Sequence, residues 1–528
     1  MSMLSRISAV MYLLICCGCM FSCSKKYELP SSTPAPITSA KNGSKPQLQQ
    51  GTSFYALTDA NELVQFNTGK PLYEMGSVTI TGLPANEKII AIDFRPATGQ
   101  LYGLGNSSRL FLINPENGRS SMINPTPFSP AINGEIAGFD FNPTVDRIRL
   151  VTNTGQNLRL HPETGAVVAM DGQLNPGTPS VSGVAYTNNF AGATTTLLYD
   201  IDAGTDKLYI QNPPNNGGLV EVGSLGIMAT GEAGFDIAPD NSLALAALFG
   251  RGEEEEGEEQ SPGNKYRFYS INLQTGAAMN LGKTDRMITG VAIPTNPVAY
   301  AVDAANRLYI FNPYETSNIL TKSITGLQTG EQITGIDMRP VNGQLYALGS
   351  TSRLYSINTA NGMATVIGMP FSTPLAGTAF GFDFNPTVDR IRIVSNTGQN
   401  LRVHPVTGAL VANDIALNPG MPMVDGAAYT NNFAGTTSTV LYDIDVQTDK
   451  LYIQNPPNNG TLVEVGSLQV DVDIQNGFDI GGTSGKAFAL LTSNGSTKLY
   501  SINLATGHAT AISMFPVNVR GFAIGLGF

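Results

Sequence analysis

The sequence predicts an all-β protein of the β-propeller class, in which blade-like modules repeat along the chain. Three observations support this prediction. The 528 residues include 57 glycines and 32 prolines, and only 13% are charged, which is typical of a turn-rich β protein. Short segments of alternating apolar and polar residues recur along the chain without an amphipathic helix between them. The second part of the chain also repeats the first, so the modules form two homologous halves.

The N-terminal segment, residues 1–22, is predicted to be a lipoprotein signal peptide. Arg6 precedes an apolar run over residues 7–17, which is too short for an ordinary membrane-spanning helix. The following Met-Phe-Ser-Cys sequence resembles the cleavage motif of bacterial lipoproteins, which makes Cys23 the expected lipidated residue. Cys19 is a less favourable alternative, and a plain secretory signal is the alternative to lipidation.

Residues 23–52 are rich in Ser, Pro, Thr, Lys and Gln, so we expect a flexible tether between the lipid and the folded part. The expected location is the cell envelope, at the outer membrane, on a face that the sequence does not indicate. All four cysteines lie within the first 23 residues, which excludes disulfides and cysteine metal sites from the folded part. The net charge of −11 argues against a nucleic-acid partner. The expected partners are the membrane, through the lipid, and an unknown protein or glycan.

The repeat of the first half in the second is nearly exact over long stretches. Residues 138–165 read GFDFNPTVDRIRLVTNTGQNLRLHPETG, and residues 381–408, 243 positions later, differ from them at only four positions. Repetition of this kind predicts two structurally equivalent units. We place the first propeller-type unit at residues 53–295 and the second at residues 296–528.

A shorter motif divides each unit into five modules. It consists of Gly or Ala, an apolar residue, Asp or Ala, and a second apolar residue, and it recurs at spacings of 44 to 56 residues. A turn and two further alternating strands follow most copies, which is typical of propeller blades. The third position of the motif is occupied, in chain order, by Asp93, Asp140, Ala185, Asp236, Ala292, Asp337, Asp383, Ala428, Asp479 and Ala523.

The chain ends indicate how the modules are joined. Residues 520–524 are one strand without the rest of its module, whereas residues 53–57 open a module that lacks its first strand. A terminal strand that completes the first module removes free sheet edges. Two arrangements fit, two five-bladed propellers in tandem or one ten-bladed ring. The short link at residues 294–297 favours the ring, but the near-identity of the copies favours two propellers, which we expect.

The motifs FDFNPTVDRIR, TGQNLR, AYTNN and IDFRPATGQLYGLG resemble the bacterial family known as domain of unknown function 4394, in two tandem copies. The resemblance covers nearly all of residues 53–528. It implies a secreted or envelope-associated β protein and brings no catalytic residues with it. The Glu-rich insert at residues 250–265 departs from the second copy. We expect it to be a solvated loop, with calcium collection as the remote alternative.

The richest polar constellation lies in the second module of each half. Strand alternation places Arg147 with Arg149, and Arg159 with His161, and pairing of the two strands would bring all four onto one blade face. The second half repeats the pattern with Arg390, Arg392, Arg402 and His404. One interpretation is an anion-binding or ligand-binding site, because arginine forks bind oxyanions.

The interpretation that we favour for these arginines is structural. The next module places two carboxylates on one face, Asp200 with Asp202 in the first half and Asp443 with Asp445 in the second. Adjacent blades stack face to face, and buried charges require partners. We therefore expect ion pairs between blades, with the ligand site as the alternative.

The recurring Asp of the short motif is a second candidate. If its strand lines a central channel, Asp93, Asp140 and Asp236 would form an acidic ring that attracts cations. We favour the alternative in which each carboxylate accepts backbone N–H groups from a neighbouring blade. Asp200, Asp202 and Asp206 loosely resemble a calcium loop, but Asp is common in such turns. We therefore expect no metal and no cofactor, with calcium as the minor alternative.

The sequence gives little support to an enzymatic function. Only His161, His404 and His508 are present as histidines, and no zinc-protease, serine-hydrolase or phosphate-binding motif occurs. We expect a non-enzymatic binding or interaction scaffold without catalytic residues. The alternative is a lipoprotein hydrolase or lyase acting on an anionic glycan or polymer through Arg147, Arg149 and His161.

Overall fold

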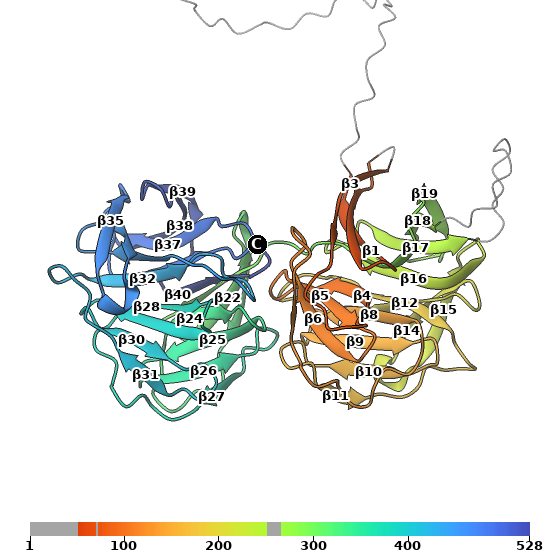
Figure 1. The fold of residues 1–528 in the computed structure, drawn as a ribbon, viewed down its shortest axis with the longest axis horizontal. Coiled ribbons are helices and arrows are strands. Elements are labelled where there is room, and N and C mark those ends of the chain that lie inside the picture. Colours follow the sequence, from red (N-terminus) through yellow and green to blue (C-terminus); the bar gives the residue numbers. More distant parts are fainter. Residues whose placement is uncertain (1–50, 70–71, 251–265) are drawn as a thin grey trace, which may run out of the picture. The chain divides into compact units, whose positions relative to one another are not determined.

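The computed structural model describes residues 51–69, 72–250 and 266–528 (Figure 1). The predicted signal peptide, the predicted lipidation site Cys23, nearly all of the tether and the Glu-rich insert after Gly250 lie outside these residues. The described part is all-β, with ten four-stranded antiparallel sheets and two short 3-10 helices, η1 (Pro214–Asn216) and η2 (Pro457–Asn459). The predicted all-β class and the ten modules are therefore confirmed. No helix within the described ranges is long and apolar enough to cross a membrane.

The described residues of the first half, within 53–292, form twenty strands. They are β1 (Ser53–Thr58), β2 (Glu62–Asn67), β3 (Tyr73–Thr79), β4 (Ile89–Phe94), β5 (Leu101–Gly105), β6 (Arg109–Ile113), β7 (Ser120–Met122), β8 (Ala137–Asn142), β9 (Arg147–Thr152), β10 (Asn157–Leu160), β11 (Val167–Met170), β12 (Val181–Tyr186), β13 (Leu198–Asp202), β14 (Lys207–Gln211), β15 (Leu219–Ser224), β16 (Ala229–Ile237), β17 (Ala244–Gly250), β18 (Tyr266–Ile271), β19 (Ala278–Thr284) and β20 (Ile288–Ala292).

The second half, residues 299–524, repeats this succession. Its strands are β21 (Ala299–Asp303), β22 (Arg307–Asn312), β23 (Glu315–Ser323), β24 (Ile333–Arg339), β25 (Gln344–Gly349), β26 (Arg353–Ile357), β27 (Ala364–Ile367), β28 (Phe380–Asn385), β29 (Arg390–Ser395), β30 (Asn400–Val403), β31 (Leu410–Asn413), β32 (Val424–Tyr429), β33 (Leu441–Asp445), β34 (Lys450–Gln454), β35 (Leu462–Ser467), β36 (Gly477–Ile480), β37 (Ala487–Ser493), β38 (Ser496–Ile502), β39 (Ala509–Met514) and β40 (Val519–Ile524).

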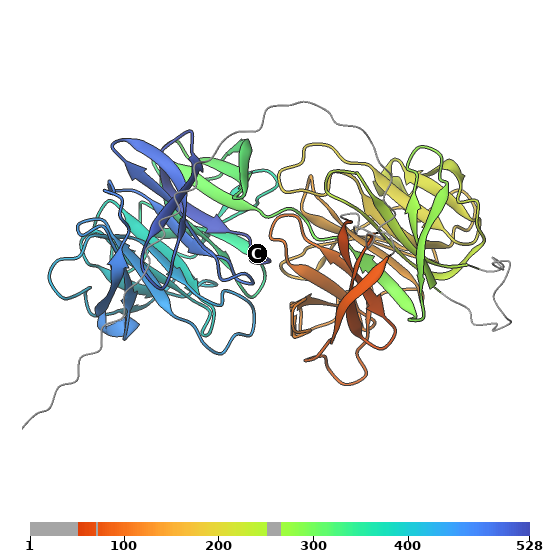
Figure 2. The same ribbon diagram turned by 90° about the horizontal axis from the view of Figure 1, so that it is seen from above.

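The last strand of each half completes the first sheet of the same half. The sheet orders are β20-β1-β2-β3 and β40-β21-β22-β23. Ala56 lies opposite Val291 in the first half, and Tyr300 lies opposite Ala523 in the second. Blue β40 therefore lies among green strands in Figure 1, and the two ends of each half also meet in the view from above in Figure 2. This is the pairing that the incomplete terminal modules predict.

One strand of every sheet, here called the inner strand, contacts the inner strands of the neighbouring sheets. In the first half the contacts run from β4 to β8, β12, β16 and β20, and β20 contacts β4. In the second half they run from β24 to β28, β32, β36 and β40, and β40 contacts β24. The contacts between inner strands thus follow two separate cycles of five sheets.

The inner strands of the second half approach one another closely at glycine. A Cβ atom built on Gly381 would lie 2.6 Å from the Cβ of Ala427, and one on Gly477 would lie 2.3 Å from the Cβ of Phe522. The same holds around the cycle, where every inner strand carries one such glycine, namely Gly335, Gly381, Gly426, Gly477 and Gly521. Glycine is required here because a side chain would separate the neighbouring backbones.

The core consists of apolar layers between consecutive sheets. The layer between the first and the last sheet of a half is rich in aromatic rings. In the first half the rings of Phe54 and Phe66 each lie 5.0 Å from the ring of Phe268. In the second half Phe311 lies 5.1 Å from Phe515. Contacts of this kind add to the area that these rings bury and stabilise the junction of the two ends of each half.

The glycine packing predicts the effect of a single added methyl group. In Gly234→Ala, the Cβ would lie 2.4 Å from the backbone N of Val291 and 2.6 Å from the carbonyl C of Gly290. Because both atoms belong to the backbone of β20, we expect the free energy of unfolding to fall by about 2 kcal/mol or more. Urea denaturation measures the change. Gly76→Ala, where nothing lies within 4 Å of the added Cβ, is the control, and equal effects of the two variants would contradict the prediction.

Candidate functional site

The arginine constellation lies on paired strands, as the sequence predicts. In the first half β9 pairs with β10, and Arg149 lies directly opposite Arg159. In the second half Arg392 lies opposite Arg402 in the same register. Two like charges at directly opposed positions destabilise a sheet unless a counter-charge lies between them.

The counter-charge is a carboxylate from the same sheet. Asp171, immediately after β11, accepts a 2.6 Å hydrogen bond from Nη1 of Arg149 and a 2.8 Å bond from Nε of Arg159. Asp414 bridges Arg392 and Arg402 in the same way, at 2.6 and 2.7 Å. Neither carboxylate was among the residues predicted from the sequence, because each follows its strand and lies outside the charged motif, although the two form a repeated pair.

Arg149 also joins its sheet to the next one. Its guanidinium donates to Oδ1 of Asn157 at 2.6 Å, to Oδ1 of Asn215 at 2.9 Å and to the hydroxyl of Tyr186 at 3.3 Å. Asn215 belongs to η1 and Tyr186 to β12, both in the following module. Arg149 is only 2% exposed. It therefore has a structural role, and the hypothesis of an open anion site does not apply to it or to its counterpart Arg392, which is equally buried.

The expected ion pairs between Arg149 and the carboxylates of β13 are not formed. Both oxygens of Asp200 are buried and have no hydrogen-bond partner, and the same is true of Asp443. Oδ1 of Asp202 accepts the N–H of Gly204 at 2.8 Å, and Oδ1 of Asp445 accepts the N–H of Gln447 at 2.9 Å. The prediction of ion pairs between the arginines and the carboxylates of the next module was wrong. Asp171 and Asp414 lie in the same sheets as the arginines and accept their hydrogen bonds instead.

The remaining members of the constellation make backbone contacts. Arg147 donates to the carbonyl of Asp146 at 2.7 Å, and Arg390 donates to the carbonyl of Asp389 at 2.8 Å. Nδ1 of His161 accepts the N–H of Glu163 at 3.3 Å, and Nδ1 of His404 accepts the N–H of Val406 at 3.2 Å. These contacts leave anion binding by Arg147, Arg390 and the histidines as a prediction.

His161 is held in its neutral form. Burial, followed by the positive charges of Arg147 and Arg95, lowers its pKa to about 4. Arg95 itself is buried and donates to Oδ1 of Asp146 at 2.8 Å and to Oε1 of Glu163 at 2.9 Å. This ion-pair group links the module of Asp93 to the following one, that of Asp140, and the sequence motif did not indicate it.

The recurring aspartates of the inner strands form the most unusual group. One carboxylate oxygen from each of Asp93, Asp140 and Asp236 lies within 4.8 Å of the others, and Asp337, Asp383 and Asp479 form the same group in the second half. We call these the first and the second aspartate triad. All six residues are only 1% exposed.

The triads also confirm the expected bonds between modules. Asp93 accepts the N–H of Phe141 at 2.8 Å, Asp140 accepts that of Tyr186 at 3.1 Å, and the N–H of Ile293 lies 2.5 Å from Asp236. In each case the donor belongs to the following module. The same aspartates therefore accept backbone N–H groups of the following module and also form a cluster of acidic side chains, so the two interpretations do not exclude each other.

Both triads resist full ionisation. Burial and then the charge of Asp236 raise the pKa of Asp93 well above its ordinary value. Burial and then repulsion from Asp93 and Asp236 do the same for Asp140. Burial raises the pKa of Asp236 to about 7, and that of Asp479 in the second half also to about 7. Each triad must therefore hold protons or another counter-charge near neutral pH.

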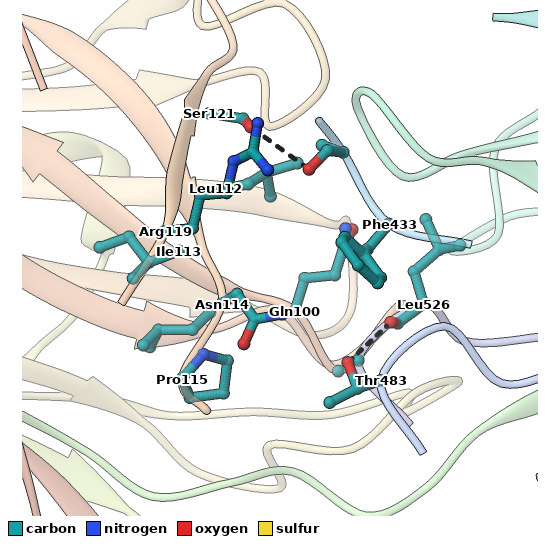
Figure 3. A pocket seen from close by; sticks show the side chains of 14 residues that line it. Gln100, Leu112, Ile113, Asn114, Pro115, Arg119, Ser121, Phe433, Thr483 and Leu526 are labelled. Atoms are coloured by element: carbon teal, nitrogen blue, oxygen red, sulfur yellow. Dashed lines mark hydrogen bonds between the residues drawn. The ribbon is translucent and has the colours of Figure 1, made fainter. Parts of the chain in front are cut away.

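A pocket between β6 and more distant segments offers little for chemistry (Figure 3). It has a volume of about 40 Å³, and its lining includes Gln100, Leu112 and Phe433, with Arg119 as its one charged residue. It has room for a few water molecules but no acid–base pair. We therefore assign it no role in a reaction.

The bridging carboxylate yields a test of the structural role of the arginines. Asp171→Ala leaves Arg149 buried without its counter-charge, so we expect the free energy of unfolding to fall by about 3 kcal/mol. Chemical denaturation measures the loss. Glu221→Ala, which removes the exposed ion pair to Lys207, is the control and should leave the midpoint unchanged. A stable Asp171→Ala protein that gains affinity for phosphate would show instead that the arginines are available to ligands.

The raised pKa values of the triads predict how stability depends on pH. A carboxyl whose pKa rises from 3.8 to about 7 on folding binds more protons in the native state. Its contribution is complete below about pH 4 and is lost as the pH rises towards 7. We therefore expect the metal-free protein to lose stability from pH 5 to pH 7 in urea titrations.

The double variant Asp140→Asn with Asp383→Asn should flatten this dependence. Each substitution removes a titrating group and keeps an oxygen that can accept the N–H of Tyr186 or Tyr429. Asp240→Asn, at an exposed turn, should leave the slope unchanged. An equally steep slope in the double variant would contradict the role assigned to the triads.

The comparisons with known proteins agree with the duplicated architecture. No curated protein matches the chain. A solved structure of PorZ, a bacterial surface component of the type-IX secretion system of Porphyromonas gingivalis, is similar at 13% identity and a TM-score of 0.24. The alignment covers 89% of this chain and 60% of that one, and a likeness of this size carries no argument. The model of the family called Domain of unknown function (DUF4394) matches residues 62–292 and again 307–523. The chain therefore belongs to this family, of which it contains two copies.

Proposed function

We propose that the protein is a non-enzymatic binding scaffold of the bacterial cell envelope, built from two closed five-bladed β-propellers. Closure is supported by the two cycles of inner-strand contacts and by the last strand of each half, which completes the first sheet. A closed ring has no gap between its first and its last blade, and it presents rigid loops and outer strands to a partner. The lipid on Cys23 and the tether after it would hold this scaffold at the membrane.

The observation that carries the proposal is the chemistry of the outer strands, the fourth strand of each sheet. Each of the ten outer strands exposes at least one large apolar side chain to solvent. In chain order, one such residue on each strand is Met75, Met122, Met170, Val220, Met279, Leu320, Val366, Val411, Val463 and Met514. Single exposed apolar residues are ordinary, but their recurrence on every edge strand is not. Methionine adapts its shape to different partners, and an edge strand offers unpaired backbone groups.

Two open hollows lie beside these strands. One has a volume of about 550 Å³ and is lined by Met421, Tyr452 and Glu464, among others. The other has a volume of about 700 Å³ and includes Met514 and Phe515. Both volumes fall within the usual range of ligand sites. Their mixture of apolar and polar groups suits a peptide or a glycan.

The enzymatic alternative has weaker support. Arg149 is buried and has four polar partners, so it is not available to a substrate. His161 is neutral near pH 7, but its Nδ1 already accepts a backbone N–H. An acid–base pair within reach of an open cavity is the usual basis of hydrolysis, and these residues do not provide one.

An array of envelope glycans and peptides tests the proposal when turnover is measured together with binding. We expect binding without turnover, and weaker binding by Met170→Asp or Met514→Asp if the ligand contacts the outer strands. The same preparation tests the anchor, since Cys23→Ser should move the protein from the membrane fraction to the soluble one. Turnover that disappears in the double variant His161→Ala with His404→Ala would overturn the scaffold proposal.

A further inference from the structure

Each aspartate triad concentrates negative charge where the structure gives it no basic partner. Among the described residues, no hydrogen bond or ion pair joins a triad carboxylate to Lys, Arg or His. The donors are backbone N–H groups, those of Phe94 and Phe141 to Asp93, of Tyr186 to Asp140, and of Ile237 and Ile293 to Asp236. Buried charges are usually paired with a basic group or with a metal.

A second observation points to a missing ligand. Oδ1 of Asp140 accepts the N–H of Tyr186, whereas Oδ2 is buried and has no hydrogen-bond partner. The whole residue is 1% exposed, so no bulk water satisfies this oxygen. A buried carboxylate oxygen without a partner costs free energy. A bound cation within the triad would supply the partner.

A small hollow lies among the inner strands of the second half. Its volume is about 10 Å³, and its lining includes the five inner-strand glycines, Gly335, Gly381, Gly426, Gly477 and Gly521. Three of them lie two residues before a triad aspartate on the same strand, so the side chains of those aspartates point to the same face. The hollow also borders Asp425, whose buried Oδ1 has no partner. Each triad aspartate thus lies two residues further along an inner strand than a glycine that lines this hollow.

We propose that each aspartate triad binds one calcium ion, so that a complete chain binds two. The ligands are carboxylate oxygens, with neither sulfur nor imidazole, which favours a hard cation. Calcium–oxygen distances of 2.3–2.6 Å allow two opposite ligands to lie up to about 5.2 Å apart. The limit of 4.8 Å between the triad oxygens falls within this span. Three carboxylates provide part of the coordination, and water completes it.

The ion would act as a clasp between modules. The first triad joins β4, β8 and β16, three of the five inner strands of its half. Binding would replace the protons that the isolated triad holds, so affinity rises with pH. Calcium should therefore restore the stability that the metal-free protein loses as the pH rises.

Equilibrium dialysis against calcium chloride at pH 8, with elemental analysis of the full chain, tests the proposal. We expect two calcium ions per chain, one in Asp140→Asn, one in Asp383→Asn and none in the double variant. Calcium should raise the melting temperature of the chelator-treated protein more at pH 8 than at pH 5. The two halves serve as internal controls, because a variant of one triad leaves the other unchanged.

Asp240→Asn is the matched control. It removes a carboxylate that follows β16 closely and accepts hydrogen bonds from Ser242, so the stoichiometry should stay at two. If Asp140→Asn fails to fold, the count for Asp383→Asn and the calcium-dependent melting of the unaltered chain still decide the question. A chain that binds no calcium at pH 8, or a double variant that still binds two ions, would overturn the proposal. Stability that depends on pH but not on calcium would show that the triads hold protons only.

Discussion

The close approach of the inner strands is the constraint on which the rest of the structure depends. An inner strand is the edge of its own sheet, so its outward N–H groups need partners from elsewhere. Glycine allows the neighbouring backbone to come near, and the aspartate two residues later accepts the N–H of the next module. Gly138 with Asp140 and Gly381 with Asp383 repeat this arrangement. The short motif in the sequence therefore corresponds to one way of joining adjacent modules, by close backbone packing at glycine and a hydrogen bond to aspartate.

Charge serves two different purposes in the molecule. Around Arg149 the charges are paired, since Asp171 accepts hydrogen bonds from both Arg149 and Arg159, and three neutral side chains accept further hydrogen bonds from Arg149. In the triads the carboxylates have no basic partner, and burial together with their mutual repulsion raises their pKa values. Paired groups stabilise the fold without further help, whereas unpaired groups make it respond to the solution around them. The binding surface that we propose is composed of other residues, mainly apolar ones.

Much of the fold could be predicted from the sequence because the same strand pattern repeats along it. Alternation and spacing predict the ten modules, the strand that completes each first sheet and the position of Arg149 opposite Arg159. The partners of the arginines did not follow, because Asp171 and Asn215 reach them from a strand end and from a 3-10 turn, whose direction depends on the folded chain. Asp200 and Asp202 were plausible partners by pattern alone. The convergence of three aspartates from different modules was predicted only as an alternative, since spacing along the chain does not give the distance between the inner strands.

The strand that completes each first sheet has a consequence for the order in which the protein forms. The first sheet of the first half is incomplete until β20 is synthesised, and β20 leaves the ribosome more than two hundred residues after β1. Until then β1 offers an open edge. The link between β20 and β21 spans only residues 293–298, so the open edge of the second half emerges just as that of the first is filled. Because the halves are so similar, β20 and β40 compete for the same kind of edge. The order of synthesis favours the correct pairing of β20 with β1, since β20 is synthesised long before β40.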